Sequence, residues 1–157
     1  MMINRAHKMD HVHSDIRGPL YVESQRMIKE GIDVLRLNTG NPATFGFTLP
    51  DSIREAMLAG LDKAVGYCDP KGMLEAREAI CEYHLSKGFE RISPDDIYIG
   101  NGVSELITMS MQGLLDNGDE VLVPSPDYPL WTACTNLAGG TAVHYICDES
   151  SDWYPDL

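Results

Sequence analysis

The sequence has few basic residues and no long apolar run. Its 157 residues include 12 Lys and Arg against 24 Asp and Glu, which gives a formal net charge of -12. Nucleic acids and anionic membranes both need a basic protein surface, so neither is an expected partner. No apolar stretch is long enough to cross a bilayer. The polar N-terminus lacks the apolar core of a secretory signal.

The sequence also lacks closely spaced cysteines. The four cysteines are widely spaced and form no Cys-x-x-Cys pair: Cys68, Cys81, Cys134 and Cys147. In a chain without a secretory signal, this pattern indicates reduced thiols and a cytoplasmic protein. Cys81 and Cys134 fall in expected helices and are predicted to be small buried residues. His7, His11 and His13 share a polar N-terminal arm, but no cysteine or carboxylate has a recognised ligand spacing, so we expect no metal site.

A strand, a glycine turn and a helix follow one another at residues 96–105. Residues 97–99 form a short apolar run that predicts a strand, and Gly100 and Gly102 then break it. The first amides of the helix that follows have no internal partner and carry partial positive charge, and glycine lets a ligand approach the backbone. The pattern therefore predicts a phosphate site. An ordinary tight turn remains the alternative, because Gly-x-Gly alone is a weak motif.

The remainder of the chain alternates expected helices and strands. Apolar spacing and turn formers predict helices over residues 19–30, 52–62, 73–87, 103–115 and 130–138. Short apolar runs predict strands over residues 34–37, 97–99, 120–123 and 142–146. Asp51 is the expected N-cap of the second helix, and Gly31 and Gly88 are the expected stops of the first and third. From residue 96 the order β-α-β-α-β predicts an α/β fold with a parallel sheet.

A second candidate loop follows the strand over residues 120–123. Open α/β sheets bind ligands at the carboxyl ends of their strands. If this strand lies next to the strand over residues 97–99, Tyr128 lies beside the glycine turn, where its ring could stack on a flat ligand. Ser104 could offer its N–H and its hydroxyl to a phosphate. Together the two residues fit a phosphorylated flat ring, although Tyr128 alone is better explained by packing.

Six blocks along the chain carry a resemblance to a known family. They are Ile16-Arg17-Gly18-Pro19, Leu37-Asn38-Thr39-Gly40-Asn41-Pro42, Gly66-Tyr67-Cys68-Asp69-Pro70-Lys71-Gly72, Ile97-Tyr98-Ile99-Gly100-Asn101-Gly102-Val103-Ser104-Glu105, Val123-Pro124-Ser125-Pro126-Asp127-Tyr128-Pro129-Leu130-Trp131 and Cys147-Asp148-Glu149-Ser150-Ser151-Asp152-Trp153. In order and spacing they resemble the pyridoxal-phosphate-dependent aminotransferases of fold type I, class I/II, and most of all the bacterial alanine (glutamate–pyruvate) aminotransferases. The resemblance extends from about Asp15 to Leu157.

The resemblance implies pyridoxal 5'-phosphate as cofactor and assigns residues to it. Gly102, Val103 and Ser104 match the family's phosphate-binding turn. Tyr128 matches the aromatic residue that stacks on the pyridine ring. Tyr67 matches the tyrosine that reaches the cofactor phosphate of the neighbouring subunit, which implies a homodimer for the full-length protein.

The resemblance also assigns substrate contacts and shows what is missing. Gly40 matches the glycine at the substrate carboxylate, and Arg17 lies in the arm that folds over the substrate. The family's lysine that binds the cofactor covalently, its aspartate at the pyridine nitrogen, its asparagine and its carboxylate-binding arginine all lie beyond Leu157. The chain therefore resembles less than half of such an enzyme, holds no catalytic residue, and is expected not to turn over alone. We assign residues 1–50 to the arm and the first piece of the small domain, and residues 51–157 to the large domain.

The sequence and the resemblance leave three functions possible. The first is transfer of an amino group between an amino acid and a 2-oxo acid, with alanine, pyruvate, glutamate and 2-oxoglutarate as the implied substrates. The second is another fold type I reaction, such as that of a carbon–sulfur lyase, since one cofactor site serves several chemistries. The third is a non-catalytic binding or dimerisation module.

Overall fold

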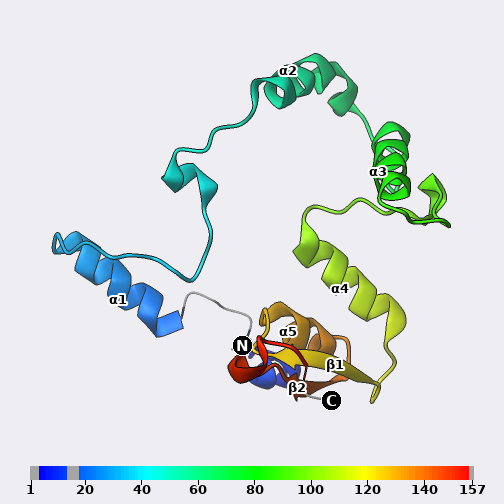
Figure 1. The fold of residues 1–157 in the computed structure, drawn as a ribbon. Helices are drawn as coiled ribbons and strands as arrows, with labels where there is room; N and C mark the ends of the chain where they lie inside the picture. The colour runs from blue at the N-terminus through cyan, green and yellow to red at the C-terminus, as the bar shows by residue number, and fades with distance from the viewer. Residues whose placement is uncertain (1–3, 14–17, 156–157) are drawn as a thin grey trace. The chain divides into compact units, whose positions relative to one another are not determined.

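The computed structural model describes residues 4–13 and 18–155. The chain divides into two compact units, one of residues 1–19 and 100–157 and the other of residues 20–99. The described residues form helices α1 (Gly18–Lys29), α2 (Asp51–Gly60), α3 (Leu74–Ser86), α4 (Val103–Leu114) and α5 (Leu130–Leu137), with strands β1 (Glu120–Ser125) and β2 (Thr141–Ile146) (Figure 1). Short 3-10 helices lie at His7–His11, Pro42–Phe45, Leu61–Val65, Pro94–Asp96 and Glu149–Ser151. The five expected α-helices are confirmed.

The two strands form a parallel pair. The register extends from Glu120 opposite Thr141 to Ser125 opposite Ile146. Parallel strands need a crossover connection, and α5 provides it and packs on both strands (Figure 1). The core of this unit is small and lies between α5 and its neighbours, where Val123 and Ala133 are each 2% exposed. The expected parallel α/β arrangement is therefore confirmed for the part of the chain that follows α4.

Glycines end the helices where the sequence predicted. Gly31 has φ of 80° and Gly88 has φ of 93°, which is the left-handed conformation that glycine adopts without a steric penalty. Each lies two residues beyond its helix, Gly31 after α1 and Gly88 after α3. Both expected helix stops are confirmed.

Two expected strands are not found in the described chain. Residues 34–37 form no strand, and residues 97–99 are extended but form no ladder among the described residues. Ile97 is buried, and the Ile99 N–H donates to the Lys71 carbonyl oxygen at 2.9 Å. An apolar run predicts extended backbone, but a strand also needs a partner for its ladder, and that partner is not local in sequence. Residues 97–99 belong to the unit of residues 20–99 and β1 to the other unit, so the expected neighbourhood of these two segments stays a prediction.

The expected N-cap of α2 is also wrong. Pro50 occupies the N-cap position, and Asp51 is the first helical residue. The Asp51 carboxylate accepts a hydrogen bond from Arg54 at 2.6 Å instead of capping the backbone. A carboxylate in the first turn still interacts favourably with the helix dipole, so the residue favours the helix by another route.

Cysteine burial follows the prediction. Cys81 and Cys134 are each 5% exposed, and all four cysteines are free thiols.

Within residues 4–13 and 18–155, no group of His, Cys, Asp and Glu side chains is arranged to hold a metal ion. None of the described helices has both the length and the apolar character needed to span a membrane.

Asp96 has a lowered pKa that can be tested. The Ser93 hydroxyl donates to its carboxylate at 2.7 Å and the Ser93 N–H at 2.9 Å, and these two bonds hold the pKa of Asp96 below its ordinary value. A lowered folded-state pKa stabilises the fold above the ordinary value of about 3.9, and this contribution is lost as the pH falls through the folded-state pKa. We expect Ser93→Ala to raise the pKa of Asp96, measured by NMR titration of the carboxyl carbon. Ser93→Thr keeps the hydroxyl and is the control, and an unchanged pKa in Ser93→Ala would contradict the assignment.

Candidate cofactor-binding site

The turn before α4 has a shape that requires glycine. Gly102 adopts φ of 85° and ψ of 167°, a region that is essentially limited to glycine. A Cβ on Gly102 would meet nothing within 4 Å, so the backbone conformation and not crowding makes the requirement. Gly100 is restricted by space, since a Cβ there would lie 2.8 Å from a methyl group of Leu106. The two glycines of the motif thus serve different steric needs.

The start of α4 presents hydrogen-bond donors. Val103 and Ser104 are its first two residues, and helix geometry leaves their N–H groups without an intrahelical acceptor. Gly102 has no side chain to cap them. The Glu105 carboxylate accepts a hydrogen bond from the Asn101 N–H, so it turns back toward the preceding loop. Two amides and the Ser104 hydroxyl form a donor set that suits a phosphate, and these residues fit the cofactor that the resemblance implies.

Packing fixes the first turns of α4. The Thr108 hydroxyl donates to the Ser104 carbonyl oxygen at 2.8 Å and lies 3.4 Å from the Cys134 sulfur of α5. About one turn further along α4, the Met111 sulfur lies 3.6 Å from the Thr135 hydroxyl of α5. Cys134 and Thr135 are buried. The donor-bearing end of α4 is therefore attached to the core of its unit through α5.

Tyr128 lies in the loop between β1 and α5. The residue is 48% exposed, so it is not part of the small core of this unit, and its stacking role stays a prediction. Next to it, the Asp127 carboxylate lies 3.3 Å from the Thr132 hydroxyl, which is also 2.9 Å from His144 Nε2 on β2. This Asp127–Thr132–His144 network ties the backbone beside Tyr128 to the sheet. It was not predicted from the sequence, because no spacing rule connects residues on a loop, a helix and a strand.

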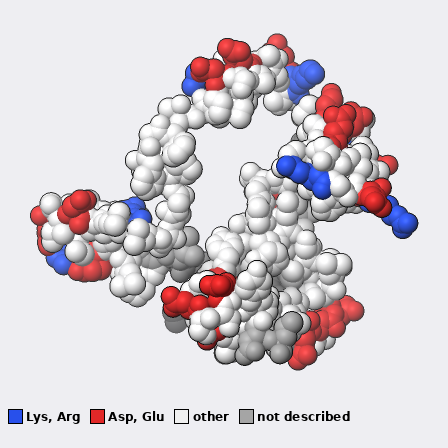
Figure 2. Space-filling view, in the orientation of Figure 1, with Lys and Arg blue, Asp and Glu red and all other residues white. Residues whose placement is uncertain are grey.

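Residues 100–157 contain no Lys or Arg that could bind a phosphate. All 12 Lys and Arg residues precede residue 92, whereas residues 100–157 contain nine Asp and Glu. In Figure 2, the surface over β1, β2 and α5 shows Asp and Glu but no Lys or Arg. A phosphate bound at Val103 and Ser104 would therefore receive positive potential from the end of α4 and not from a side-chain cation of this segment.

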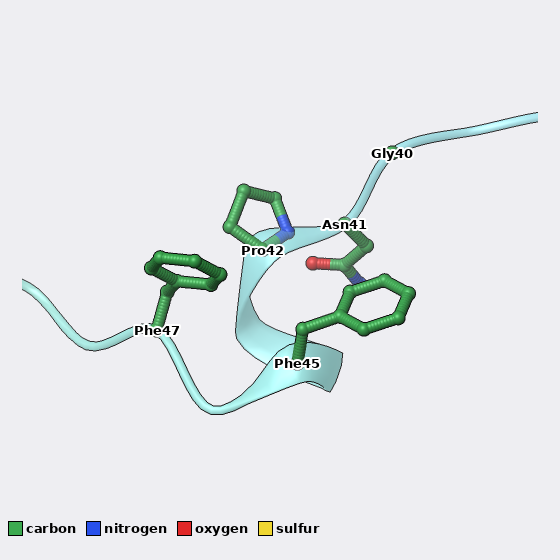
Figure 3. Close-up of a pocket in the computed structure, with 5 residues that line it drawn as sticks. All are labelled: Gly40, Asn41, Pro42, Phe45 and Phe47. Atoms are coloured by element: carbon green, nitrogen blue, oxygen red, sulfur yellow. The ribbon is translucent and has the colours of Figure 1, made fainter.

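Gly40 belongs to the other unit and lines an apolar hollow. The hollow has a volume of about 400 Å³ and is formed by Gly40, Asn41, Pro42, Phe45 and Phe47. In the view of Figure 3, the Pro42 ring lies between Phe47 on one side and Asn41 and Phe45 on the other. The Phe45 and Phe47 rings are largely exposed. The hollow itself does not select a carboxylate, so the substrate role of Gly40 stays a prediction.

Tyr67 lies in the same unit and is fully exposed, in the loop between the 3-10 helix at 61–65 and α3. A tyrosine that extends from a loop is available to a partner surface. Arg17 lies outside the described residues, so its predicted substrate contact is not tested. The structure brings Gly102, Val103 and Ser104 together in one turn and places Tyr128 in the same unit.

Comparison with known proteins gives the family. The sequence matches the family Aminotransferase class I and II over residues 32–157. It is 56% identical over 153 residues to the glutamate-pyruvate aminotransferase AlaA of Haemophilus influenzae, covering 98% of this chain and 38% of that protein. It is 56% identical over 151 residues to the alanine aminotransferase of Mycobacterium tuberculosis, covering 96% of this chain and 35% of that protein.

Structural comparison agrees. The crystal structure of an aminotransferase from Escherichia coli matches with a TM-score of 0.91 and 54% sequence identity, covering 99% of this chain and 39% of that one. The chain thus spans less than two fifths of the length of these relatives. The resemblance read from the six sequence blocks is confirmed, including the expectation that the chain corresponds to only part of such an enzyme. The chain belongs to the class I and II aminotransferase family and has part of the fold type I architecture.

Proposed function

We propose that this chain contributes part of the cofactor site of an aminotransferase that uses pyridoxal 5'-phosphate. The observation that supports this most directly is the glycine-shaped turn before α4, which leaves the amides of Val103 and Ser104 free for a phosphate. Family membership supports the same cofactor. The bound cofactor supplies an electron sink for the carbon that loses or gains the amino group.

Each residue of the site has a distinct task in this proposal. The Val103 and Ser104 amides and the Ser104 hydroxyl bind the phosphate and so fix one end of the cofactor. The Tyr128 ring covers one face of the pyridine ring and sets its plane. The Tyr67 hydroxyl donates a hydrogen bond to the cofactor phosphate of the partner subunit in a homodimer. Correct placement of a flat cofactor by groups of this kind is a large part of what a protein adds to cofactor chemistry.

The substrates are proposed from the relatives. Those named above are a glutamate-pyruvate aminotransferase and an alanine aminotransferase. We propose alanine and glutamate as amino donors, with pyruvate and 2-oxoglutarate as acceptors, and a cytoplasmic location. Gly40 is the proposed contact to the substrate carboxylate, and Arg17 is a proposed substrate contact from the arm that folds over the substrate. We also propose that residues 1–50 form the arm and the start of the small domain, and residues 51–157 the first part of the large domain.

The test uses the full-length gene product in which these residues occur. With pyridoxal 5'-phosphate present, alanine and 2-oxoglutarate should give pyruvate and glutamate, at a rate of the order of 1 to 10³ per second. Pyruvate formation is followed with a coupled dehydrogenase. The 157-residue chain is the control and should form no product, since the family's cofactor-binding lysine is not within it. Release of a thiol from cystathionine without amino transfer would favour a carbon–sulfur lyase instead, and failure to bind the cofactor would overturn the proposal.

A further inference from the structure

Arg77 is a buried charged residue without a function in the site described above. It lies in the first turn of α3, and its side chain is only 5% exposed. Its Nε donates to the Gly72 carbonyl oxygen at 3.1 Å and its Nη1 to the Pro94 carbonyl oxygen at 2.9 Å. The carboxylates of Asp69 and Asp95 each lie 3.6 Å from the guanidinium. These four partners compensate the burial of a charge that would otherwise be strongly unfavourable.

Two of the four partners belong to the loop that carries Tyr67. Asp69 and Gly72 follow Tyr67 by two and five residues, and further bonds hold the same short segment. The Lys71 N–H donates to the Asp69 carboxylate at 2.8 Å, and the Ile99 N–H donates to the Lys71 carbonyl oxygen at 2.9 Å. The base of the loop is therefore tied down at residues 69–72, while the Tyr67 side chain extends freely into solvent.

We propose that Arg77 is a positioning residue for Tyr67. By binding Asp69 and Gly72, it fixes the base of the loop, so that the Tyr67 hydroxyl is already placed for the cofactor phosphate of the partner subunit. This inference rests on the proposed function. Without the anchor the loop samples more conformations, and ordering it on binding reduces the affinity for the cofactor.

A purely structural role for Arg77 makes a different prediction. If Arg77 only stabilised the packing of α3 against residues 94–96, its replacement would lower the unfolding temperature, and any effect on cofactor binding would be independent of Tyr67. If Arg77 acts through Tyr67, its replacement has nothing left to disturb once the Tyr67 hydroxyl is absent. A double-mutant cycle on cofactor affinity separates the two roles, because only residues that act together give a coupling energy.

The cycle is measured in the full-length protein, using the dissociation constant of pyridoxal 5'-phosphate from fluorescence titration. Arg77→Lys keeps the charge but cannot reproduce the fork of donors that reaches four partners. We expect Arg77→Lys and Tyr67→Phe each to weaken binding about tenfold, which corresponds to about 1.4 kcal/mol. The double variant should bind within about twofold of Tyr67→Phe alone, because well-coupled effects are not additive.

A second pair of variants avoids dependence on the stability of Arg77→Lys. Asp69→Asn removes the ion pair on the loop side but keeps an oxygen for the Lys71 N–H, and it should weaken cofactor binding about threefold, in the range of a partly exposed ion pair. Asp95→Asn is the comparison variant, because its carboxylate lies at the same distance from Arg77 but Asp95 is outside the loop. Its carboxylate also lies 3.8 Å from Lys71 Nζ, but the Lys71 hydrogen bond to the Asp95 carbonyl oxygen at 2.7 Å is retained, so the affinity should fall less than in Asp69→Asn.

The outcomes are distinguishable. A wild-type protein that binds no pyridoxal 5'-phosphate overturns the proposed function and with it this inference. A wild-type protein that binds normally, with Arg77→Lys and Tyr67→Phe effects that simply add, overturns the positioning role alone. Equal losses in Asp69→Asn and Asp95→Asn would also overturn it.

Discussion

Gly102→Ala should weaken the binding of pyridoxal 5'-phosphate by about tenfold or more. The native φ of 85° and ψ of 167° are essentially restricted to glycine, and such strain costs about 1–3 kcal/mol for any other residue. Space is not the obstacle, since a Cβ at this position would meet nothing within 4 Å. The turn must either retain the strain or relax, and relaxation rotates the Val103 and Ser104 amides away from a phosphate.

The measurement is cofactor affinity in the full-length protein, by fluorescence or equilibrium dialysis, alongside thermal unfolding. Gly113→Ala is a matched control, because Gly113 lies within α4 and a Cβ there also meets nothing within 4 Å. Alanine in a helix is favoured over glycine by about 0.5–1 kcal/mol, so this control should be slightly stabilised and should bind normally. Wild-type affinity in Gly102→Ala would show that the turn is not the phosphate site.

The glycine turn at residues 100–102 is encoded by residues that are adjacent in the sequence. A Gly-x-Gly step between an apolar run and a helix is encoded within ten residues, so the sequence alone could identify the candidate turn and its donors. The helices were likewise predictable, because apolar spacing and glycine stops are local signals. The two strands that did not form, at 34–37 and 97–99, depend on partners that no local pattern specifies.

The role of Arg77, in contrast, could not be predicted from local sequence patterns. A single arginine in a helix with three glutamates is ordinarily expected to face solvent, since arginine is rarely buried without partners. Its partners are carbonyl oxygens and carboxylates on the loop at 69–72 and on the 3-10 helix at 94–96, which come together only in the folded unit. The same holds for the Asp127–Thr132–His144 network beside Tyr128. Residues that position a site through contacts distant in sequence are therefore harder to predict than the glycine turn, which is encoded locally.

Tyr128→Ala should also cause a large loss, with cofactor binding weakened by about tenfold. An aromatic pair contributes about 0.5–1.5 kcal/mol beyond the burial of its surface, and alanine removes both contributions. The fold should tolerate the change, because the Tyr128 ring is half-exposed in this structure and contributes little to the core. The neighbouring Asp127–Thr132–His144 network stays intact in the variant and should keep the loop in place.

Two further variants decide what the ring does. Tyr128→Phe keeps the aromatic face and should retain the cofactor nearly as well as the wild type, whereas Tyr128→Leu keeps apolar bulk without a π-system and should resemble Tyr128→Ala. Retention is measured as the rate at which pyridoxal 5'-phosphate leaves the full-length protein during dialysis, since weakened contacts act mainly on dissociation. If leucine serves as well as phenylalanine, the side chain fills space and does not stack. If all three variants match the wild type, Tyr128 has no part in the cofactor site, and the donors at the start of α4 must position the cofactor without it.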